Sequence, residues 1–201
     1  LGKQLEQKFN LRNGADPQVY GIGIKELWEI QPDKHVKGMV MHTAGWPLPA
    51  DTYGGSFCYH YGDNLVSIGY VVGLGYSNPH LSPFEEFQRY KTHPQIRAML
   101  EGGKRISYGA RAISAGGIQA LPKLIFPGGA LLGDDAGFLN VSRIKGSHAA
   151  IKSGMMAAES VAEALAAGRA GDELSSYPQK FRESWLYEEL HKARNFKPWM
   201  S

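Results

Sequence analysis

Two adjacent aspartates, Asp134 and Asp135, follow a run of apolar residues in the 201-residue chain. Gly133 precedes them, and glycine permits a sharp turn because it has no Cβ. We expect a buried strand to end at Leu132 and Asp134 to project from its carboxyl end, where ligands bind in layered α/β folds. A carboxylate accepts hydrogen bonds from sugar or ribityl hydroxyl groups. The alternative, that either aspartate only caps a turn or a helix, stays open on these residues alone.

The segment after the aspartates carries positive charge where a helix is expected to begin. Arg143 and Lys145 precede a pattern of small residues over 147–167, and no acidic residue follows before Glu159. Helix N-termini normally favour Asp or Glu in the first turn. This start instead suits an anion such as a pyrophosphate, or a flavin ring with negative charge at N1 and O2. The alternative is a packed helix whose basic residues are only solvated.

Few other residues form a pattern with a chemistry of its own. Gly54 and Gly55 offer main chain without Cβ to a flat ligand, but a turn with positive φ is the simpler explanation of these residues alone. The histidines show no metal-ligand spacing, and no G-x-S-x-G nucleophile motif surrounds Ser56. Cys58 is the single cysteine, which excludes an internal disulfide and a four-cysteine cluster built from this chain alone.

Composition indicates a globular protein, because 43% of the residues are hydrophobic and 20% are charged. The formal net charge of +3 is small, and no basic stripe or RNA-binding aromatic motif is present, so nucleic acid is not an expected partner. No apolar run approaches the roughly eighteen residues that a membrane span needs. The chain starts at Leu1 without a signal-peptide pattern, which suggests a piece of a longer protein.

Hydrophobic periodicity predicts a block of strands followed by one strand–loop–helix unit. We expect helices over 1–12, 82–100, 147–167 and 174–195, and strands over 19–30, 38–43, 54–74 (a hairpin turning at 62–64), 104–113 and 123–132 (interrupted at 127–129). The start of the second helix is well marked, since Ser82 can cap it and Pro83 suits its first position. This order indicates two lobes of an α+β or mixed α/β protein.

The residues around the aspartates also carry a resemblance. The pattern GD-x-AGF, followed by AA-x-KSG-x-x-AAE, is similar to the second flavin-binding motif of the glutathione-reductase and hydroxybenzoate-hydroxylase class. More specifically, the chain closely resembles the family of electron-transfer-flavoprotein:ubiquinone oxidoreductases over the stretches HTAGWPLPADTYGGSFCYH, LSPFEEFQRYKTHPQIRAMLEGGKRISYGARAI and GFLNVSRIKGSHAAIKSGMMAAES. The resemblance runs over nearly the whole chain.

The resemblance implies a division of the chain between two kinds of domain. An antiparallel-sheet, quinone-side lobe would accompany the C-terminal part of a glutathione-reductase-like FAD domain. The expected parts are a linking helix from the FAD domain (1–18), the ubiquinone-binding lobe (19–118), the strand–GD–helix unit of the FAD domain (119–170), and a C-terminal helix with a basic, aromatic tail (171–201).

The same resemblance implies cofactor and substrate contacts. FAD would be held by Gly133, Asp134, Asn140, Gly146, Ser147 and His148. Asp134 would hold the ribityl chain, the helix start at 146–148 would approach the pyrimidine edge of the flavin, and Asn140 would lie beside the ring. Gly54 and Gly55 would contact ubiquinone. The resemblance assigns no catalytic residue and no metal ligand to this chain.

The family implies an electron-transferring-flavoprotein dehydrogenase with FAD and a [4Fe–4S] cluster, which passes electrons from reduced electron-transfer flavoprotein to ubiquinone. Such an enzyme is a peripheral or monotopic protein at the surface of a bacterial or mitochondrial inner membrane. The family's GxGxxG finger and its cysteine cluster are absent from the sequence, so the segment alone is expected to be inactive. The alternatives are an NAD(P)H-dependent flavin monooxygenase, an isoprenoid-lipid reductase, and a non-catalytic domain that keeps the fold.

Overall fold

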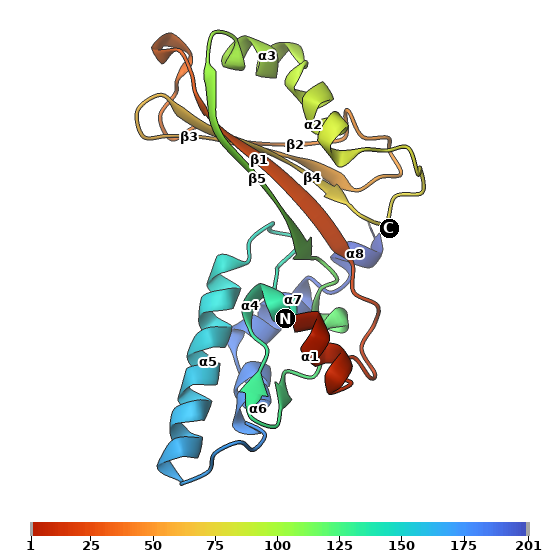
Figure 1. Cartoon of the computed structure of the whole chain (residues 1–201), viewed down its shortest axis with the longest axis vertical. Coiled ribbons are helices and arrows are strands. Elements are labelled where there is room, and N and C mark those ends of the chain that lie inside the picture. Colours follow the sequence, from red (N-terminus) through yellow and green to blue (C-terminus); the bar gives the residue numbers. More distant parts are fainter. Residues whose placement is uncertain (1, 200–201) are drawn as a thin grey trace. The chain divides into compact units, whose positions relative to one another are not determined.

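The computed structural model describes residues 2–199, which divide into two compact units (Figure 1). Residues 20–113 form the first, here called the sheet unit. The segments up to residue 19 and from residue 114 onward form the second, here called the helical unit.

The sheet unit is built on a five-stranded antiparallel sheet with the strand order β2-β3-β4-β1-β5 (Figure 1). The strands are β1 (Tyr20–Glu29), β2 (Val40–Ala44), β3 (Gly54–Tyr61), β4 (Leu65–Gly73) and β5 (Lys104–Ser114). The β3–β4 hairpin turns at 62–64, as predicted, and both Gly62 and Asn64 have positive φ there. The predicted α+β or mixed α/β fold class is confirmed.

Two helices, α2 (Pro83–Lys91) and α3 (Pro94–Leu100), follow β4 in the sheet unit, with a short 3-10 helix η1 (Pro32–Lys34) between β1 and β2. Alternate side chains of the strands point into one core, as the two-residue period of a strand requires. That core consists of Ile30, Leu48, Cys58, Val66, Ile68, Tyr70, Val72, Leu81, Phe87, Tyr90, Ile96 and Leu100.

The prediction of one continuous helix over 82–100 is wrong. The chain leaves the helix at Thr92, and His93 has the extended backbone angles φ −55° and ψ 133°. Pro94 causes this break, because its ring disfavours the helical conformation of the preceding residue and it lacks an N–H for the helix ladder.

The helical unit contains short elements around one long helix. They are α1 (Gly2–Lys8), the 3-10 helix η2 (Ile118–Ala120), β6 (Ile125–Phe126), β7 (Gly129–Ala130), α4 (Gly133–Ala136), α5 (Ser147–Ala166), α6 (Ser176–Arg182), α7 (Trp185–Lys192) and α8 (Phe196–Trp199). Its core consists of Leu11, Leu124, Ile125, Phe126, Leu131, Ala136, Phe138, Ala149, Met156, Ala157, Tyr177, Phe181, Leu186 and Leu190.

Three predicted elements of the helical unit differ from the structure. The segment 123–132, expected as one short strand interrupted at 127–129, is a hairpin of two shorter strands, β6 and β7, with its turn at 127–128, and Leu132 is exposed. The first helix stops at Lys8, and Asn10 has a positive φ. The last helix is divided between α6 and α7, because the extended backbone of Ser184 starts a new helix and its hydroxyl accepts a hydrogen bond from the Tyr187 N–H.

Candidate functional site

The turn at Gly133 is fixed against the first two turns of α5. Gly133 has a φ of 59°, which strains any residue with a Cβ, and such a Cβ would lie 3.4 Å from the Cβ of Ala150. The Gly133 N–H donates to the hydroxyl of Ser153 at 3.0 Å, and this contact is buried. The backbone conformation therefore favours glycine here, whereas the space beside Ala150 would allow an ordinary van der Waals contact.

Asp134 and Asp135 lie in the first turn of the short helix α4, and both are exposed. The prediction that a strand ends at Leu132 is wrong by two residues, because β7 ends at Ala130 and the chain passes through Leu131 and Leu132 directly into α4. Acidic residues in a first helical turn are electrostatically favourable. The alternative role at a helix start thus fits the observed backbone.

The N-terminus of α5 is open to an anionic or acceptor group. Gly146 precedes the helix without a side-chain capping hydrogen bond, and no acidic residue lies in the first turn. A Cβ on Gly146 would lie 3.2 Å from Leu139 Cδ1, so the loop packs closely behind this end. The aligned peptide dipoles of a 20-residue helix favour negative charge at its start.

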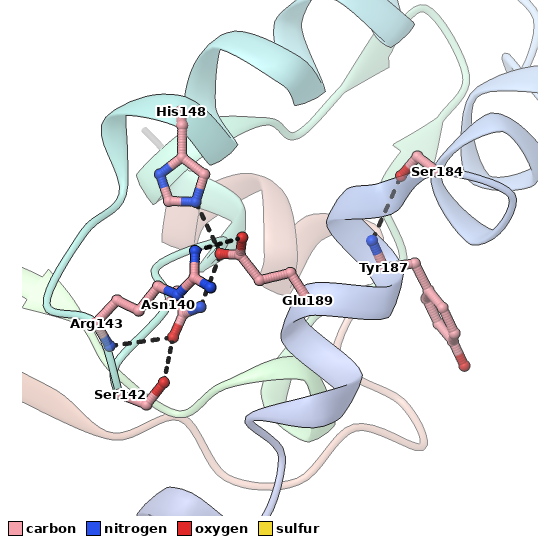
Figure 2. Close-up of polar contacts among 7 residues, drawn as sticks. All are labelled: Asn140, Ser142, Arg143, His148, Ser184, Tyr187 and Glu189. Carbon is pink, nitrogen blue, oxygen red and sulfur yellow. Dashed lines mark hydrogen bonds and ion pairs between the residues drawn. The ribbon is translucent and has the colours of Figure 1, made fainter.

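Glu189 of α7 joins this region, and no sequence pattern pointed to it (Figure 2). Its Oε1 accepts hydrogen bonds from Asn140 Nδ2 at 2.7 Å and from His148 Nε2 at 2.8 Å. Its Oε2 pairs with Arg143 Nη1 at 3.2 Å. The Glu189 side chain is only 16% exposed, so these contacts replace water that it has lost.

Glu189 places a negative charge beside the basic residues at the start of α5. Burial would raise the pKa of Glu189, but the donors Asn140 and His148, with the nearby charge of Arg143, together lower it below its ordinary value. Along the sequence no acidic residue follows these basic residues before Glu159, but in the folded chain the Glu189 carboxylate, 46 residues beyond Arg143, contacts them.

Asn140 organises the loop that leads into α5. It is 2% exposed, and its Oδ1 accepts hydrogen bonds from the Ser142 hydroxyl at 2.8 Å and the Arg143 N–H at 3.3 Å. Its main chain exchanges two hydrogen bonds with Lys145, at 3.1 and 3.3 Å. The side chain and main chain of Asn140 are thus engaged in holding the loop closed.

A surface pocket of about 380 Å³ lies beside Glu189. It is lined by Asn140, Ser142, Arg143, Trp185, Glu188, Glu189, Lys192 and Ala193. The half-exposed Trp185 ring stacks on the His148 ring, with centroids 5.9 Å apart and 12° between the ring planes. One wall of the pocket is therefore the same group of residues that closes the loop before α5.

Gly54 and Gly55 lie within β3, and neither has a positive φ, so the alternative of a turn is wrong. A Cβ on Gly54 would lie 2.4 Å from Leu48 Cδ1, and one on Gly55 would lie 2.2 Å from the carbonyl oxygen of Thr43. Both contacts are closer than real Cβ atoms allow. The two glycines therefore permit close packing of β3 against Leu48 and Thr43.

A buried chain of hydroxyl groups lies beside the glycine pair. The hydroxyls of Thr43 and Ser56 are 2.6 Å apart, and Ser56 donates to the Tyr90 hydroxyl at 2.7 Å. Burial raises the pKa of Tyr90, and the hydrogen bonds with Ser56 and Thr43 only partly offset this. Neutral hydroxyls thus connect β2 and β3 to α2.

The aromatic residues near the glycine pair in sequence have separate surroundings. Phe57 stacks on Tyr59, with centroids 5.1 Å apart. Trp46 is 48% exposed and lies beside the His93 ring, 5.7 Å away. Since Phe57 alternates with the buried residues Ser56 and Cys58 along β3, it lies on the other face of the sheet.

Residues 2–199 contain neither a candidate metal site nor a candidate membrane-spanning helix. Within this range, no group of three or more His, Cys, Asp or Glu side chains could hold a metal ion. Cys58 is fully buried, with its Sγ 3.8 Å from the Sδ of Met99. In the same described range, no helix has the length and apolar character needed to cross a membrane.

Solved structures with a similar fold include a reductase-like protein and a flavin-dependent brominase. The chain aligns with a geranylgeranyl bacteriochlorophyll reductase-like protein from Thermoplasma acidophilum at a TM-score of 0.68 and 18% identity, covering 90% of this chain and 43% of that one. It aligns with a flavin-dependent brominase at a TM-score of 0.60 and 16% identity, covering 88% and 45%. At such identities the likeness concerns the fold alone.

Sequence relatives are much closer. The chain is 62% identical to the electron transfer flavoprotein-ubiquinone oxidoreductase of Pseudomonas aeruginosa over 98% of its own length and 36% of the relative's. It is 54% identical to the mitochondrial enzyme of Rattus norvegicus, again over 98% of this chain, and spans 33% of that protein. The chain thus spans about a third of the curated relatives it matches.

The sheet unit also matches a known domain family. The sequence model of the family described as "ETF-QO, ubiquinone-binding" matches residues 20–113, which are the bounds of the sheet unit. The chain is therefore a relative of the electron transfer flavoprotein-ubiquinone oxidoreductases, and its residues 20–113 belong to their ubiquinone-binding domain family.

Proposed function

We propose that the chain is part of a flavin-dependent oxidoreductase that passes electrons to ubiquinone. The observation that carries this proposal is the 62% identity to an electron transfer flavoprotein-ubiquinone oxidoreductase over 98% of the chain. The match of residues 20–113 to the ubiquinone-binding family supports the same function. Reduced electron-transfer flavoprotein would be the electron donor.

FAD is the proposed cofactor, and the helical unit offers groups that suit it. Asp134 directly follows Gly133, which contacts Ala150 and Ser153 of α5, and its carboxylate would accept hydrogen bonds from ribityl hydroxyls. The N–H groups at 146–148 would face the pyrimidine edge of the flavin and stabilise negative charge there. Bound FAD would supply a centre that accepts and releases electrons. The side chain of Asn140 would act by holding the loop before α5.

Ubiquinone is the proposed acceptor, bound by the sheet unit. Gly54 and Gly55 would contact it through main-chain atoms on a side that Leu48 and Thr43 leave free, since these two residues fill the space of the missing Cβ atoms. A quinone carbonyl can accept a hydrogen bond from a peptide N–H, and a flat ring can approach main chain that lacks Cβ.

The remaining parts of the proposed reaction involve the rest of a longer protein. A [4Fe–4S] cluster would be ligated by residues outside this chain. The whole protein would associate with the surface of a bacterial or mitochondrial inner membrane as a peripheral or monotopic protein. The segment 171–201, with its basic and aromatic residues, would contribute to that association.

The experiment that tests this function compares electron donors for the full-length protein. Purified enzyme is supplied either with reduced electron-transfer flavoprotein or with NAD(P)H, and ubiquinone reduction is followed in both. We expect turnover only with the flavoprotein. Rapid NAD(P)H consumption would instead favour a flavin monooxygenase or an isoprenoid-lipid reductase.

A non-catalytic domain that keeps the fold is distinguished by a second measurement. The visible absorbance of the purified full-length protein reports bound flavin directly. Flavin absorbance that bleaches when the flavoprotein donor is added would support the proposal. A colourless protein that cannot be reconstituted with FAD would contradict it.

A further inference from the structure

The loop that leads into α5 is joined to α7 at three separate points. Asn140, Arg143 and His148 each place a side-chain nitrogen within 3.2 Å of the Glu189 carboxylate. Figure 2 shows the three side chains converging on this group. Because these donors come from the beginning, middle and end of the segment, the carboxylate fixes the whole of 140–148.

We infer that Glu189 is a positioning residue for the flavin site, acting through segment 140–148. The inference rests on the proposed function, since it requires FAD at the start of α5. The main-chain bridge between Asn140 and Lys145 closes the loop, and Gly146 ends it directly before the first helical N–H groups. A tether on this loop therefore determines where those N–H groups point.

A carboxylate suits this role better than any neutral side chain. An ionised carboxylate has two acceptor oxygens and can accept several hydrogen bonds at once, whereas glutamine has one acceptor oxygen. The Arg143 guanidinium also forms a charge-assisted contact with the carboxylate, and a neutral side chain at position 189 would lack the negative charge for this ion pair. Glutamine at position 189 would thus keep part of the tether, and alanine would remove all of it.

The physical benefit of the tether is preorganisation. Fixed N–H dipoles stabilise negative charge on a ligand without having to reorient when that charge develops. Contacts that lock the supporting residues keep such a site within a few tenths of an ångström of its working geometry. Loss of Glu189 would leave α5 folded, because the Ala149 and Met156 side chains remain in the core, but would loosen the segment that aims its first turn.

Glu188 is the matched control on the same helix. It is the neighbouring residue, carries the same charge and pairs with Lys192 at 2.6 Å in an exposed contact. The test compares E189A, E189Q and E188Q in the full-length protein. Three properties are measured: the dissociation constant of FAD, the midpoint potential of the bound flavin, and amide hydrogen exchange over 140–150 with and without FAD.

We expect E189A to weaken FAD binding by about ten- to a hundred-fold and to speed amide exchange over 140–148. E189Q should give a smaller loss of affinity and a more positive flavin potential, because it removes a negative charge near the site. E188Q should leave the FAD dissociation constant within about twofold of the wild-type value. It should also leave the flavin potential and the amide exchange rates unchanged.

Several outcomes would overturn the inference. Wild-type FAD affinity and exchange rates in E189A would do so, and so would effects of E188Q equal to those of E189Q. If E189A unfolds during the assay, E189Q decides the question, and an unchanged affinity and potential in E189Q would count against it. If the wild-type protein does not bind FAD, both the proposed function and this inference are overturned. If the wild-type protein binds FAD but no more tightly than E189A does, only the inference is overturned.

Discussion

Lys91 of α2 donates to both carboxylate oxygens of Glu26 on β1, at 2.9 Å each, although 65 residues separate the two in sequence. Glu26 is 3% exposed, and it also accepts hydrogen bonds from Trp28 Nε1 at 2.8 Å and Arg105 Nη1 at 3.2 Å. A buried carboxylate is tolerated because all of these donors replace its hydration. This group connects α2 to two strands of the sheet.

Removing one partner of this buried pair should destabilise the chain strongly. We expect Glu26→Gln to lower the free energy of unfolding by about 3–5 kcal/mol, because it leaves Lys91 without its counter-charge. Urea denaturation of the chain measures the loss. Arg97→Met is the control, since Arg97 forms an exposed pair with Glu101 at 3.8 Å, and it should have a far smaller effect. Equal effects of the two variants would contradict this account.

The same pair predicts how stability depends on pH. Burial raises the pKa of Glu26, but the hydrogen bonds from Lys91, Trp28 and Arg105 outweigh it and hold the pKa below its ordinary value of 4.5. A lowered folded-state pKa adds stability that is fully present above the unfolded value and is lost as pH falls through the folded value. The stability difference between wild type and Glu26→Gln should therefore be constant near neutral pH and shrink below pH 4.5. A difference that stays constant down to strong acid would count against it.

Gly69 on β4 lies directly opposite Phe57 on β3, and the phenyl ring occupies the space of a side chain there. A Cβ on Gly69 would lie 2.3 Å from two ring atoms and 3.1 Å from the Ile24 carbonyl oxygen. Gly69→Ala should therefore cost about 1–3 kcal/mol of stability by overpacking. Gly109→Ala on β5 is the control, because nothing lies within 4 Å of its Cβ position, and it should be neutral or stabilising by up to about 1 kcal/mol. Equal melting temperatures for the two variants would refute this role.

Cys58 should resist alkylation in the folded protein. Its side chain is fully buried, and burial raises the pKa of the thiol to about 11, so little thiolate forms near neutral pH. Labelling by iodoacetamide at pH 8 should be slow without denaturant and rapid in urea. Fast stoichiometric labelling of the native chain would show that the sheet unit opens readily.

Asp134 should matter more than Asp135 for FAD retention. A Cβ added to Gly2 would lie 3.7 Å from the Asp135 side chain, so Asp135 faces α1. The side chain of Asp134 points in a different direction, because successive residues of a helix are rotated by about 100°. We expect Asp134→Ala to weaken FAD binding by about ten- to a hundred-fold in the full-length protein. Titration of FAD into both apo variants compares them. A greater loss with Asp135→Ala would reverse the assignment.

Elements with local signals can be predicted from the order of residue types. The β3–β4 hairpin follows from a two-residue period on either side of a turn, where Gly62 and Asn64 adopt positive φ at small cost. The start of α2 follows from Ser82, whose hydroxyl accepts the Glu85 N–H at 3.4 Å, and from Pro83 beside it. Each of these contacts joins residues only a few positions apart, so the pattern of residue types contains all the partners involved.

Tertiary structure alone decided the surroundings of the candidate site. Glu189 meets Asn140 and His148 across 49 and 41 residues, and it does so because Leu186 and Leu190 pack α7 into the same core as Ala149 of α5. Gly55 likewise has a local sequence typical of a turn, yet its close contact comes from Thr43 on the neighbouring strand. Burial of apolar side chains sets which distant segments meet, and only then can charges and hydrogen bonds between them be assigned.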